Sequence, residues 1–426
     1  MISEILRRSR YLLALPVALS LAATACAPAE KNKGGESSGK IPDSITVGAT
    51  LPLTGAESKA GGRYKQGYDL AFELANSAGG IDVGDKKVKV ELKLLDDTSD
   101  QAKAVNLAQR LITQDKVDFM LGTYSTALVE AQSTVPEQNK IPYVNGGGAS
   151  SSIYSKGFKW IFGTLASIEN LSNTEMEWIQ KEQDAGKLPK PAKIAILWEN
   201  TSHGKDFRTG IRNFTAKNGG RYNIAVDESF PLDGKDFSAV LSKVRAAKVD
   251  LFMADAHLPD FLTMQRQYVT SGMCDKFITY GARGSEADAR QALGVKAVSY
   301  IVSAVWWNAQ LGNKGLNKTF VDEFKSKYGK DPEWYQAVAY EAARALFAGI
   351  SKAGSVDKEK VRDALSSLQM ESILPGGQLS FPADAGGQAT YPFVVQQNMP
   401  DGTSPIIFPD DVKTGEGVAP NPACPS

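Results

Sequence analysis

Five short turns in this sequence carry residue types that suit the binding of a small molecule. All five directly follow segments with strand patterns: residues 122–126, 145–152, 199–204, 255–259 and 281–285. The first two are rich in Gly and Ser, whose backbone N–H groups and hydroxyls can surround an anion. The last three carry charged or titratable side chains and include both histidines of the chain. We therefore expect binding chemistry rather than covalent chemistry at these turns.

The segments around the first two turns alternate between strand and helix patterns. Strands are predicted at residues 45–51, 88–94 and 117–122, and helices at residues 64–78 and 102–112. This order builds a parallel sheet that is covered by helices on both faces.

The same order starts again after Trp160, which predicts a second sheet and a second lobe. The later elements are strands at 194–198, 222–226, 249–253, 277–280 and 299–304, and helices at 207–218, 237–247, 261–271, 318–328 and 337–352. Residues 377–397 have a β-rich pattern, and the chain from Pro400 onward is expected to be loose. Ligands of such sheets bind beyond the carboxyl ends of the strands. We therefore expect all five turns to line one cleft between two lobes.

The N-terminus has the pattern of an export signal. Arg7, Arg8 and Arg10 precede an apolar stretch, residues 11–25, that is too short to span a membrane. The residues before Cys26 are similar to the lipid-attachment motif of bacterial lipoproteins, although Ala23 stands where that motif usually has Leu. We expect a signal peptide over residues 1–25, a lipid on Cys26 and a flexible tether over residues 26–43. Cleavage without lipid is the alternative.

Composition excludes several classes of function. The 426 residues are enough for two lobes, and 48 basic against 48 acidic side chains leave no basic surplus for a nucleic-acid partner. The sequence has no G-x-S-x-G, H-E-x-x-H or C-x-x-C motif, and two histidines leave little material for a catalytic triad or a metal centre. We expect no enzyme, no cofactor and no metal.

The chain has three cysteines. With Cys26 assigned to the lipid anchor, Cys274 and Cys424 can pair as a disulfide outside the cytoplasm. Two free thiols are the alternative.

Residues 51–81 read LPLTGAESKAGGRYKQGYDLAFELANSAGGI, which resembles the opening of the leucine/isoleucine/valine-binding family of type I periplasmic binding proteins. The agreement continues in order along the mature chain, at residues 96–98, 122–125, 202–204, 236–237 and 331–344 (DPEWYQAVAYEAAR). The resemblance implies an α/β fold of two Rossmann-like lobes with parallel sheets, joined by three crossovers.

The hinge crossings are predicted near Leu165, Val302 and Leu374. Lobe I is then expected over residues 44–165 and 303–373, and lobe II over residues 166–302 and 374–412. Residues 413–426 form the predicted tail.

The resemblance also assigns candidate ligand contacts in lobe I. They share a place in the predicted carboxylate-binding corner or beside it: Ser125, Thr126, Gly148, Ala149, Ser150, Tyr124 and Ala60. A hydroxyl next to consecutive N–H groups forms an anion nest without a full positive charge nearby.

In lobe II the sequence departs from the family pattern. His203 and His257 stand where relatives carry tyrosines that face the ligand. Arg283 stands where leucine-binding relatives carry a glutamate that meets the ligand's ammonium. A guanidinium there repels an ammonium and suits a second acceptor, so we expect a carboxylate without a free α-ammonium, such as an aromatic or keto acid.

Two alternatives stay open. Asp255 can replace the missing glutamate and restore amino-acid binding, or Arg283 can turn away to pair with an acidic neighbour. Four aromatic side chains near the turns are candidate walls of the pocket: Tyr124, Tyr280, Trp306 and Trp307.

The resemblance implies an extracytoplasmic solute-binding protein that closes on its ligand and delivers it to the permease and ATPase subunits of an ABC importer. Attachment to the membrane would be through the lipid on Cys26. A ligand-binding sensor module of the same fold is the alternative function.

Overall fold

The structure is a computed structural model that describes residues 41–424. The predicted signal peptide, Cys26 and most of the tether lie outside the described residues. Within residues 41–424, none of the helices combines the length and the apolar character that a membrane crossing needs.

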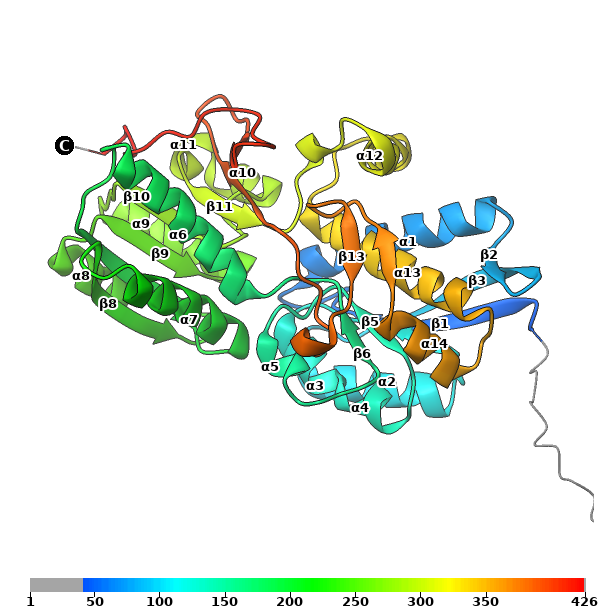
Figure 1. Ribbon diagram of the computed structural model, residues 1–426. Coiled ribbons are helices and arrows are strands. Elements are labelled where there is room, and N and C mark those ends of the chain that lie inside the picture. Colours follow the sequence, from blue (N-terminus) through cyan, green and yellow to red (C-terminus); the bar gives the residue numbers. More distant parts are fainter. Residues whose placement is uncertain (1–40, 425–426) are drawn as a thin grey trace, which may run out of the picture. The chain divides into compact units, whose positions relative to one another are not determined.

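Lobe I contains a six-stranded sheet in the order β2-β3-β1-β4-β5-β6 (Figure 1). Its strands are β1 (Ser44–Leu51), β2 (Ile81–Val83), β3 (Lys86–Asp96), β4 (Phe119–Leu121), β5 (Tyr143–Asn145) and β6 (Ile161–Gly163). Only the β2–β3 pair is antiparallel; β1, for example, pairs in parallel with β3 and with β4.

The helices of lobe I come from the first part of the chain, with three more from late in the chain. They are α1 (Ser58–Ser77), α2 (Gln101–Thr113), α3 (Thr126–Gln132), α4 (Thr134–Gln138), α5 (Ser151–Tyr154), α12 (Gly315–Tyr328), α13 (Trp334–Ala353) and α14 (Lys358–Ser366). The apolar helix α13 is buried along most of its length and packs on α1. Gly67 permits this close approach, because a Cβ there would lie 2.4 Å from the carbonyl oxygen of Gln336.

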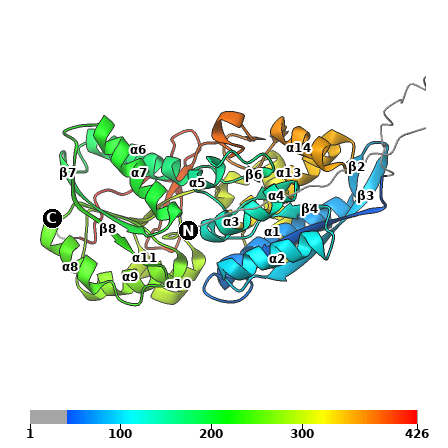
Figure 2. The same cartoon turned by 90° about the horizontal axis from the view of Figure 1, so that it is seen from below.

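Lobe II contains a seven-stranded sheet in the order β15-β14-β11-β10-β9-β7-β8. Its strands β7 and β8 are labelled in Figure 2. Its strands are β7 (Ala192–Glu199), β8 (Tyr222–Phe230), β9 (Leu251–Asp255), β10 (Phe277–Tyr280), β11 (Val302–Val305), β14 (Val394–Gln397) and β15 (Ile406–Phe408). The five strands from β8 to β11 are parallel, whereas β14 and β15 add antiparallel strands at one edge.

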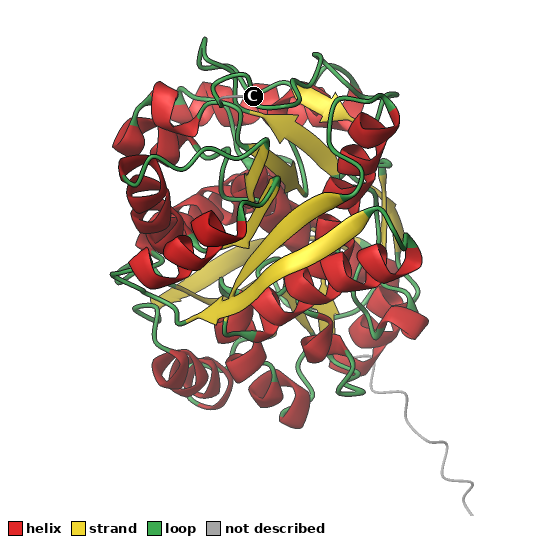
Figure 3. Cartoon of the chain, turned by 90° about the vertical axis from the view of Figure 1, so that its left-hand side faces the viewer, coloured by secondary structure: helices red, strands yellow, loops and turns green. Residues whose placement is uncertain are grey.

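Helices cover both faces of the lobe II sheet (Figure 3). They are α6 (Ile168–Asp184), α7 (Ser202–Lys217), α8 (Ser238–Ala247), α9 (Leu258–Thr270), α10 (Ala287–Leu293) and α11 (Val295–Val298). The central strands β9, β10 and β11 are buried along their whole length because both of their faces are covered. The architecture is therefore the predicted α/β fold of two lobes with mainly parallel sheets.

The structure moves two of the predicted lobe borders. Strand β11 lies in the lobe II sheet, so the second crossing follows Val305 rather than Val302. The small hairpin of β12 (Gln369–Glu371) and β13 (Gln378–Ser380) precedes Phe381, which packs on Phe162 of lobe I. Gln388 also forms a β-bridge with Gly163 of β6, so the chain stays on lobe I well past Leu374 before it joins the lobe II sheet at β14. The border at β11 was not visible in the sequence, because its apolar run continues into Trp306 and Trp307.

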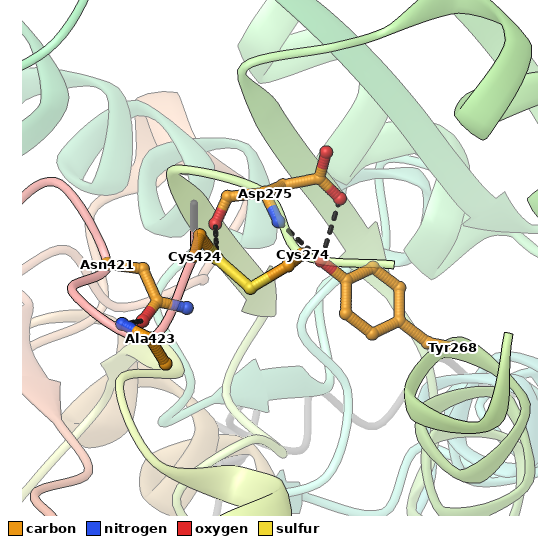
Figure 4. Close-up of a disulfide and its surroundings, with 6 residues drawn as sticks. All are labelled: Tyr268, Cys274, Asp275, Asn421, Ala423 and Cys424. Carbon is orange, nitrogen blue, oxygen red and sulfur yellow. Dashed lines mark hydrogen bonds between the residues drawn. A yellow bond between two sulfur atoms is a disulfide. The ribbon is translucent and has the colours of Figure 1, made fainter. Parts of the chain in front are cut away.

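The C-terminal tail is not loose. Its backbone bonds to lobe II, where Val418 N donates to the side chain of Gln397, and Gly417 packs closely against the ring of Trp178. Cys424 forms a disulfide with Cys274, which lies 150 residues earlier in the chain (Figure 4). The disulfide attaches the tail beside Asp275, whose carboxylate accepts a hydrogen bond from the Tyr268 hydroxyl at 2.7 Å.

Candidate functional site

A small cavity lies where the strand ends of the two lobes face each other. It contains about 180 Å³ of space, divided among narrow gaps between side chains, so those side chains must move apart to admit a ligand. Lobe I and the crossings contribute Tyr124, Ser125, Thr126, Gly147, Ala149, Leu165, Trp306 and Trp334 to its lining. Lobe II contributes His203, His257 and Arg283.

The lobe I side of the cavity is a corner of two turns that touch each other. One turn runs from β4 into α3 and carries Ser125 and Thr126; the other follows β5 and carries Gly147 and Ala149. A Cβ on Gly147 would lie 2.1 Å from the carbonyl oxygen of Thr123, so only glycine lets the turns approach this closely. Ala149 N donates to the Thr126 hydroxyl at 3.1 Å, which leaves the hydroxyl proton of Thr126 free for a ligand.

The lobe II side is built from two histidine–carboxylate pairs that cross between neighbouring strands. Glu199 ends β7 and Asp255 ends β9, and each is followed within four residues by a histidine. His203 Nδ1 lies 2.7 Å from Asp255 Oδ2, and His257 Nδ1 lies 2.6 Å from Glu199 Oε1. Each histidine thus pairs with the carboxylate of the other strand. Both carboxylates are buried behind the rings that line the cavity.

Burial sets the protonation of these groups. It raises the pKa of Glu199 to about 8, and the nearby charge of Asp255 acts in the same direction. Burial also lowers the pKa of His257, although the carboxylate of Glu57 opposes this shift. For Asp255, burial is outweighed by the charge and hydrogen bond of His203, so its pKa lies below the usual value.

Arg283 is a buried cation whose hydrogen bonds are incomplete. Its exposed fraction is 2%, and its Nη2 donates to the Tyr124 hydroxyl of lobe I at 2.9 Å. Its Nε and Nη1 have no hydrogen-bond partner among the residues that the structure describes. Glu286 Oε1 lies 3.9 Å from Nε, which is beyond hydrogen-bonding distance. Arg283 therefore keeps only a long ion pair with Glu286, without a hydrogen bond, and its side chain lines the cavity.

Aromatic rings surround this guanidinium. Its central carbon lies 5.2 Å from the ring centroid of Trp334 and 5.9 Å from those of Tyr124 and Tyr335. Contacts of this kind stabilise a buried cation that has no full ion pair.

The structure brings together seven of the predicted ligand contacts around the cavity: Tyr124, Ser125, Thr126, Ala149, His203, His257 and Arg283. Trp306, a candidate wall, also lies there, whereas Tyr280 packs on Phe261 and Trp307 packs on Phe320.

Four predicted contacts lie elsewhere. Gly148 donates its N–H to Asn145 behind the corner, and the Ser150 hydroxyl donates to Asp206 of lobe II. Asp255 is held behind His203 and does not line the cavity, and Ala60 lines a neighbouring hollow together with Glu57 and Leu258. Sequence spacing places these residues within a few ångströms of the site but does not give the direction of the side chain.

Three lining residues were missed in the sequence: Gly147, Leu165 and Trp334. The sequence predicts Leu165 only as part of a crossing between the lobes. Trp334 starts α13, and the sequence of this helix has the pattern of an ordinary buried apolar helix, which gives no sign of a ligand contact.

Direct contacts join the lobes on both sides of the cavity. On one side the carboxylate of Asp206 accepts hydrogen bonds from Ser150 and Ser151, and Ser202 donates to Glu130 at 2.7 Å. On the other side Arg63 of α1 lies 3.1 Å from Glu286 and 3.0 Å from Asp288, both of lobe II. The described arrangement is a closed one, with contacts that must break when the lobes separate.

Within residues 41–424, only Glu199, His203 and Asp255 form a group with metal-ligand spacing, with ligand atoms within 4.8 Å of one another. The hydrogen bond between His203 and Asp255 occupies atoms that a metal would need. We therefore treat this group as a proton-bearing network.

Comparisons with known proteins agree with this geometry. The model of a family described as periplasmic binding protein matches residues 44–403. The Leu/Ile/Val-binding protein homolog 7 of Brucella suis is 24% identical over 413 residues, which are 96% of this chain and 98% of that protein. Homolog 8 of the same organism is 26% identical over 380 residues, 88% of each chain.

Solved structures share the fold. A leucine-binding protein, LivK, of Thermotoga maritima superposes with a TM-score of 0.74 at 22% identity, covering 86% of this chain and 99% of that one. The branched-chain amino acid binding protein LivJ of Streptococcus pneumoniae, in complex with isoleucine, superposes with a TM-score of 0.74 at 20% identity. The match covers 88% of this chain and 100% of that one. A solute-binding protein of an ABC transporter from R. palustris, in complex with benzoate, superposes with a TM-score of 0.71 at 19% identity. The match covers 89% of this chain and 98% of that one.

The family match covers most of the chain and agrees with the two-lobed fold and the cavity between the lobes. Membership of such a family implies an extracytoplasmic location. The chain belongs to the periplasmic binding protein family, and its relatives there include the leucine/isoleucine/valine-binding homologues.

Proposed function

We propose that this protein captures a small carboxylate-bearing solute between its two lobes and delivers it to an ABC importer. The observation that carries the proposal is the lining of the cavity between the lobes. Hydrogen-bonding groups reach it from both lobes, and among its described lining residues none carries a carboxylate. A carboxylate ligand therefore meets N–H and hydroxyl donors there without a neighbouring negative charge on the wall.

The relatives support the same class of function. The curated relatives are named for binding leucine, isoleucine and valine, and two of the solved neighbours were crystallised with isoleucine and with benzoate. These ligands share one feature, a carboxylate on a largely apolar body. The corner of Ser125, Thr126 and Ala149 is the part of the cavity that suits this shared carboxylate.

Closure follows from the division of the site between the lobes. Neither lobe alone surrounds a ligand, so a ligand that touches both binds the closed form better than the open form and shifts the population toward it. The closed form is what a permease can distinguish from the empty protein. Recognition by permease and ATPase subunits belongs to this proposal.

The proposal includes a lipid anchor on Cys26 and the tether that follows it. Mass spectrometry of the protein purified from its own membrane tests this directly. A mature N-terminus at Cys26 with the mass of attached lipid supports the anchor, whereas an unmodified Cys26 leaves a secreted protein.

A screen of amino acids, keto acids and aromatic acids tests the binding function. A ligand that binds the native form raises the melting temperature, and the stabilisation grows with the logarithm of the ratio of its concentration to its Kd. We expect at least one carboxylate to do so, and small-angle scattering to show a more compact protein with that ligand. The proposal fails if no carboxylate in a broad panel changes either measurement.

A further inference from the structure

The lobe II wall of the cavity presents two buried groups that lack hydrogen-bond partners within residues 41–424. Arg283 has two such N–H groups, on Nε and Nη1, and His257 has an unpaired Nε2. Both side chains line the cavity, and their exposed fractions are 2% and 4%. Unsatisfied polar atoms are rare in buried positions, and at a cavity wall they indicate groups that a ligand completes.

The hydrogen bonds of His257 determine which of its nitrogens carries the proton. Glu199 Oε1 accepts from the backbone N–H of His257 at 2.5 Å and lies 2.6 Å from its Nδ1. The pKa of about 8 means that the Glu199 carboxyl holds a proton at neutral pH. Because Oε1 accepts the backbone N–H, it acts as the carbonyl oxygen of the carboxyl group, and the carboxyl proton is assigned to Oε2. Oε1 then suits a second N–H, so Nδ1 of His257 carries the ring proton. The neutral ring then has a bare lone pair on Nε2. His257 therefore offers the cavity an acceptor, and it needs a donor from the ligand.

Arg283 offers the opposite kind of group. A guanidinium only donates, so its two unpaired N–H groups need an acceptor. The Tyr124 ring connects the two residues: its hydroxyl accepts from Arg283 at 2.9 Å, and its centroid lies 6.0 Å from that of His257. A hydroxyl group both accepts and donates one hydrogen bond, so it can satisfy Arg283 and His257 together. An ammonium or a methyl group cannot.

The remaining walls favour a flat ligand body. Trp306 and Trp334 lie with their ring centroids 4.7 Å apart, and both line the cavity beside Leu165 and Tyr124. Aromatic walls bury planar apolar surface well, and offset or tilted ring contacts add to this. Asp255, which would be needed for an ammonium, is held behind His203.

From these contacts we propose that the ligand is an aromatic acid with a ring hydroxyl. Its carboxylate occupies the corner of Ser125, Thr126 and Ala149, and its hydroxyl lies between Arg283 and His257. This inference rests on the proposed function of solute capture. It specifies which carboxylates are preferred.

Isothermal titration of the purified protein with benzoate, meta- and para-hydroxybenzoate, and leucine tests the proposal. We expect one of the two hydroxybenzoates to bind at least about tenfold more tightly than benzoate, since a hydrogen bond to a charged group contributes about this much. Leucine should bind more weakly than either acid.

Variants assign the preference to the two residues. His257→Phe should remove the preference for the hydroxyl, so that the affinities for the hydroxybenzoate and for benzoate become about equal in this variant. Arg283→Met should weaken binding of the hydroxybenzoate at least about tenfold. Arg290→Met is the matched control, because Arg290 is a partly buried arginine of lobe II that bonds to Ser285 and lies outside this cavity. Thermal melting without ligand shows which variants fold.

The outcomes separate this inference from the proposed function. Equal affinity for benzoate and both hydroxybenzoates, or tighter binding of leucine, overturns the inference and leaves solute capture intact. A hydroxyl preference that persists in His257→Phe also overturns it. Failure of every carboxylate to bind overturns both.

Discussion

The two halves of the cavity differ in their chemistry. Lobe I presents neutral groups, hydroxyls and backbone N–H groups, which are held in place by hydrogen bonds within that lobe. Lobe II presents a cation and two histidines that are supported by buried carboxylates. The lobe I corner suits the carboxylate that many solutes share. The lobe II wall is the part that distinguishes one solute from another.

The difference extends to the energetics of each half. A neutral corner loses little when it is exposed to water in the open form, because hydroxyls and amides hydrate readily. A buried guanidinium with two unpaired N–H groups is costly in the closed, empty form. A ligand that completes Arg283 removes this cost, so the lobe II wall contributes more than the lobe I corner to the dependence of closure on ligand.

The largest expected effect follows from Arg283→Ala. The variant should weaken binding of the preferred carboxylate about a hundredfold, because it removes charge-assisted hydrogen bonds from a buried site. Titration calorimetry measures the loss. Arg283→Lys is the companion variant: it keeps the charge but not the planar fork, and it should recover only part of the affinity. Wild-type affinity in Arg283→Ala contradicts the assigned pocket.

The lobe I counterpart is Thr126→Ala, for which we expect a loss of about tenfold. It removes one neutral hydrogen bond to the ligand and the acceptor of the Ala149 N–H, whereas the other N–H groups of the corner remain. Thr113→Ala is the matched control, because Thr113 is an exposed threonine of α2 in the same lobe. A loss larger than that of Arg283→Ala would reverse the comparison between the lobes.

The contrast between the lobes also explains what the sequence could predict. The α/β fold and most elements followed from strand and helix periodicity, since these patterns are local. The five turns were found because they follow strand ends, and the parallel sheets bring such ends together. Seven of the contacts that the family resemblance assigns to these turns or beside them line the cavity.

Side-chain direction could not be predicted. Asp255 and His257 are two residues apart in one turn, yet Asp255 faces His203 and His257 faces the cavity. The crossed pairing depends on the spacing of β7 and β9, which no single segment encodes. The lobe borders were misplaced for the same kind of reason, because the partner strand of β11 decides its lobe.

The contacts between the lobes provide a test of closure that leaves the cavity lining intact. Arg63→Gln removes the charge that bridges Glu286 and Asp288 of lobe II and Glu333 of lobe I. We expect severalfold weaker binding, about the effect of one partly buried ion pair, because the closed population falls. Small-angle scattering should show a more open protein at subsaturating ligand.

Arg212→Gln is the control for this variant. Arg212 also pairs with a carboxylate, that of Asp227, but both residues belong to lobe II. The control should leave affinity and scattering unchanged. Equal effects of the two variants would assign the change to general loss of charge rather than to closure.

The smallest expected effect on ligand binding concerns the core of lobe II, where burial of ionisable groups continues away from the cavity. Glu175 of α6 accepts hydrogen bonds from Thr279 and from the backbone of Ala304, and burial raises the pKa of its carboxyl from 4.5 to about 8. The folded state therefore holds a proton that the unfolded state releases above 4.5. The contribution of Glu175 to the free energy of unfolding is complete below pH 4.5 and declines as the pH rises toward 8.

Glu175→Gln replaces the protonated carboxyl with a group that does not titrate. The melting temperature of the wild type should fall relative to that of the variant as the pH rises toward 8. Each kcal/mol of free energy of unfolding that the wild type loses should lower its melting temperature by about 2 to 4 °C. Glu359→Gln, at an exposed position of α14, is the control and should follow the wild type at every pH. Parallel melting profiles for Glu175→Gln and the wild type would mean that Glu175 is charged in the fold. The contrast between a neutral lobe I and an ionisable lobe II would then apply to the cavity wall alone.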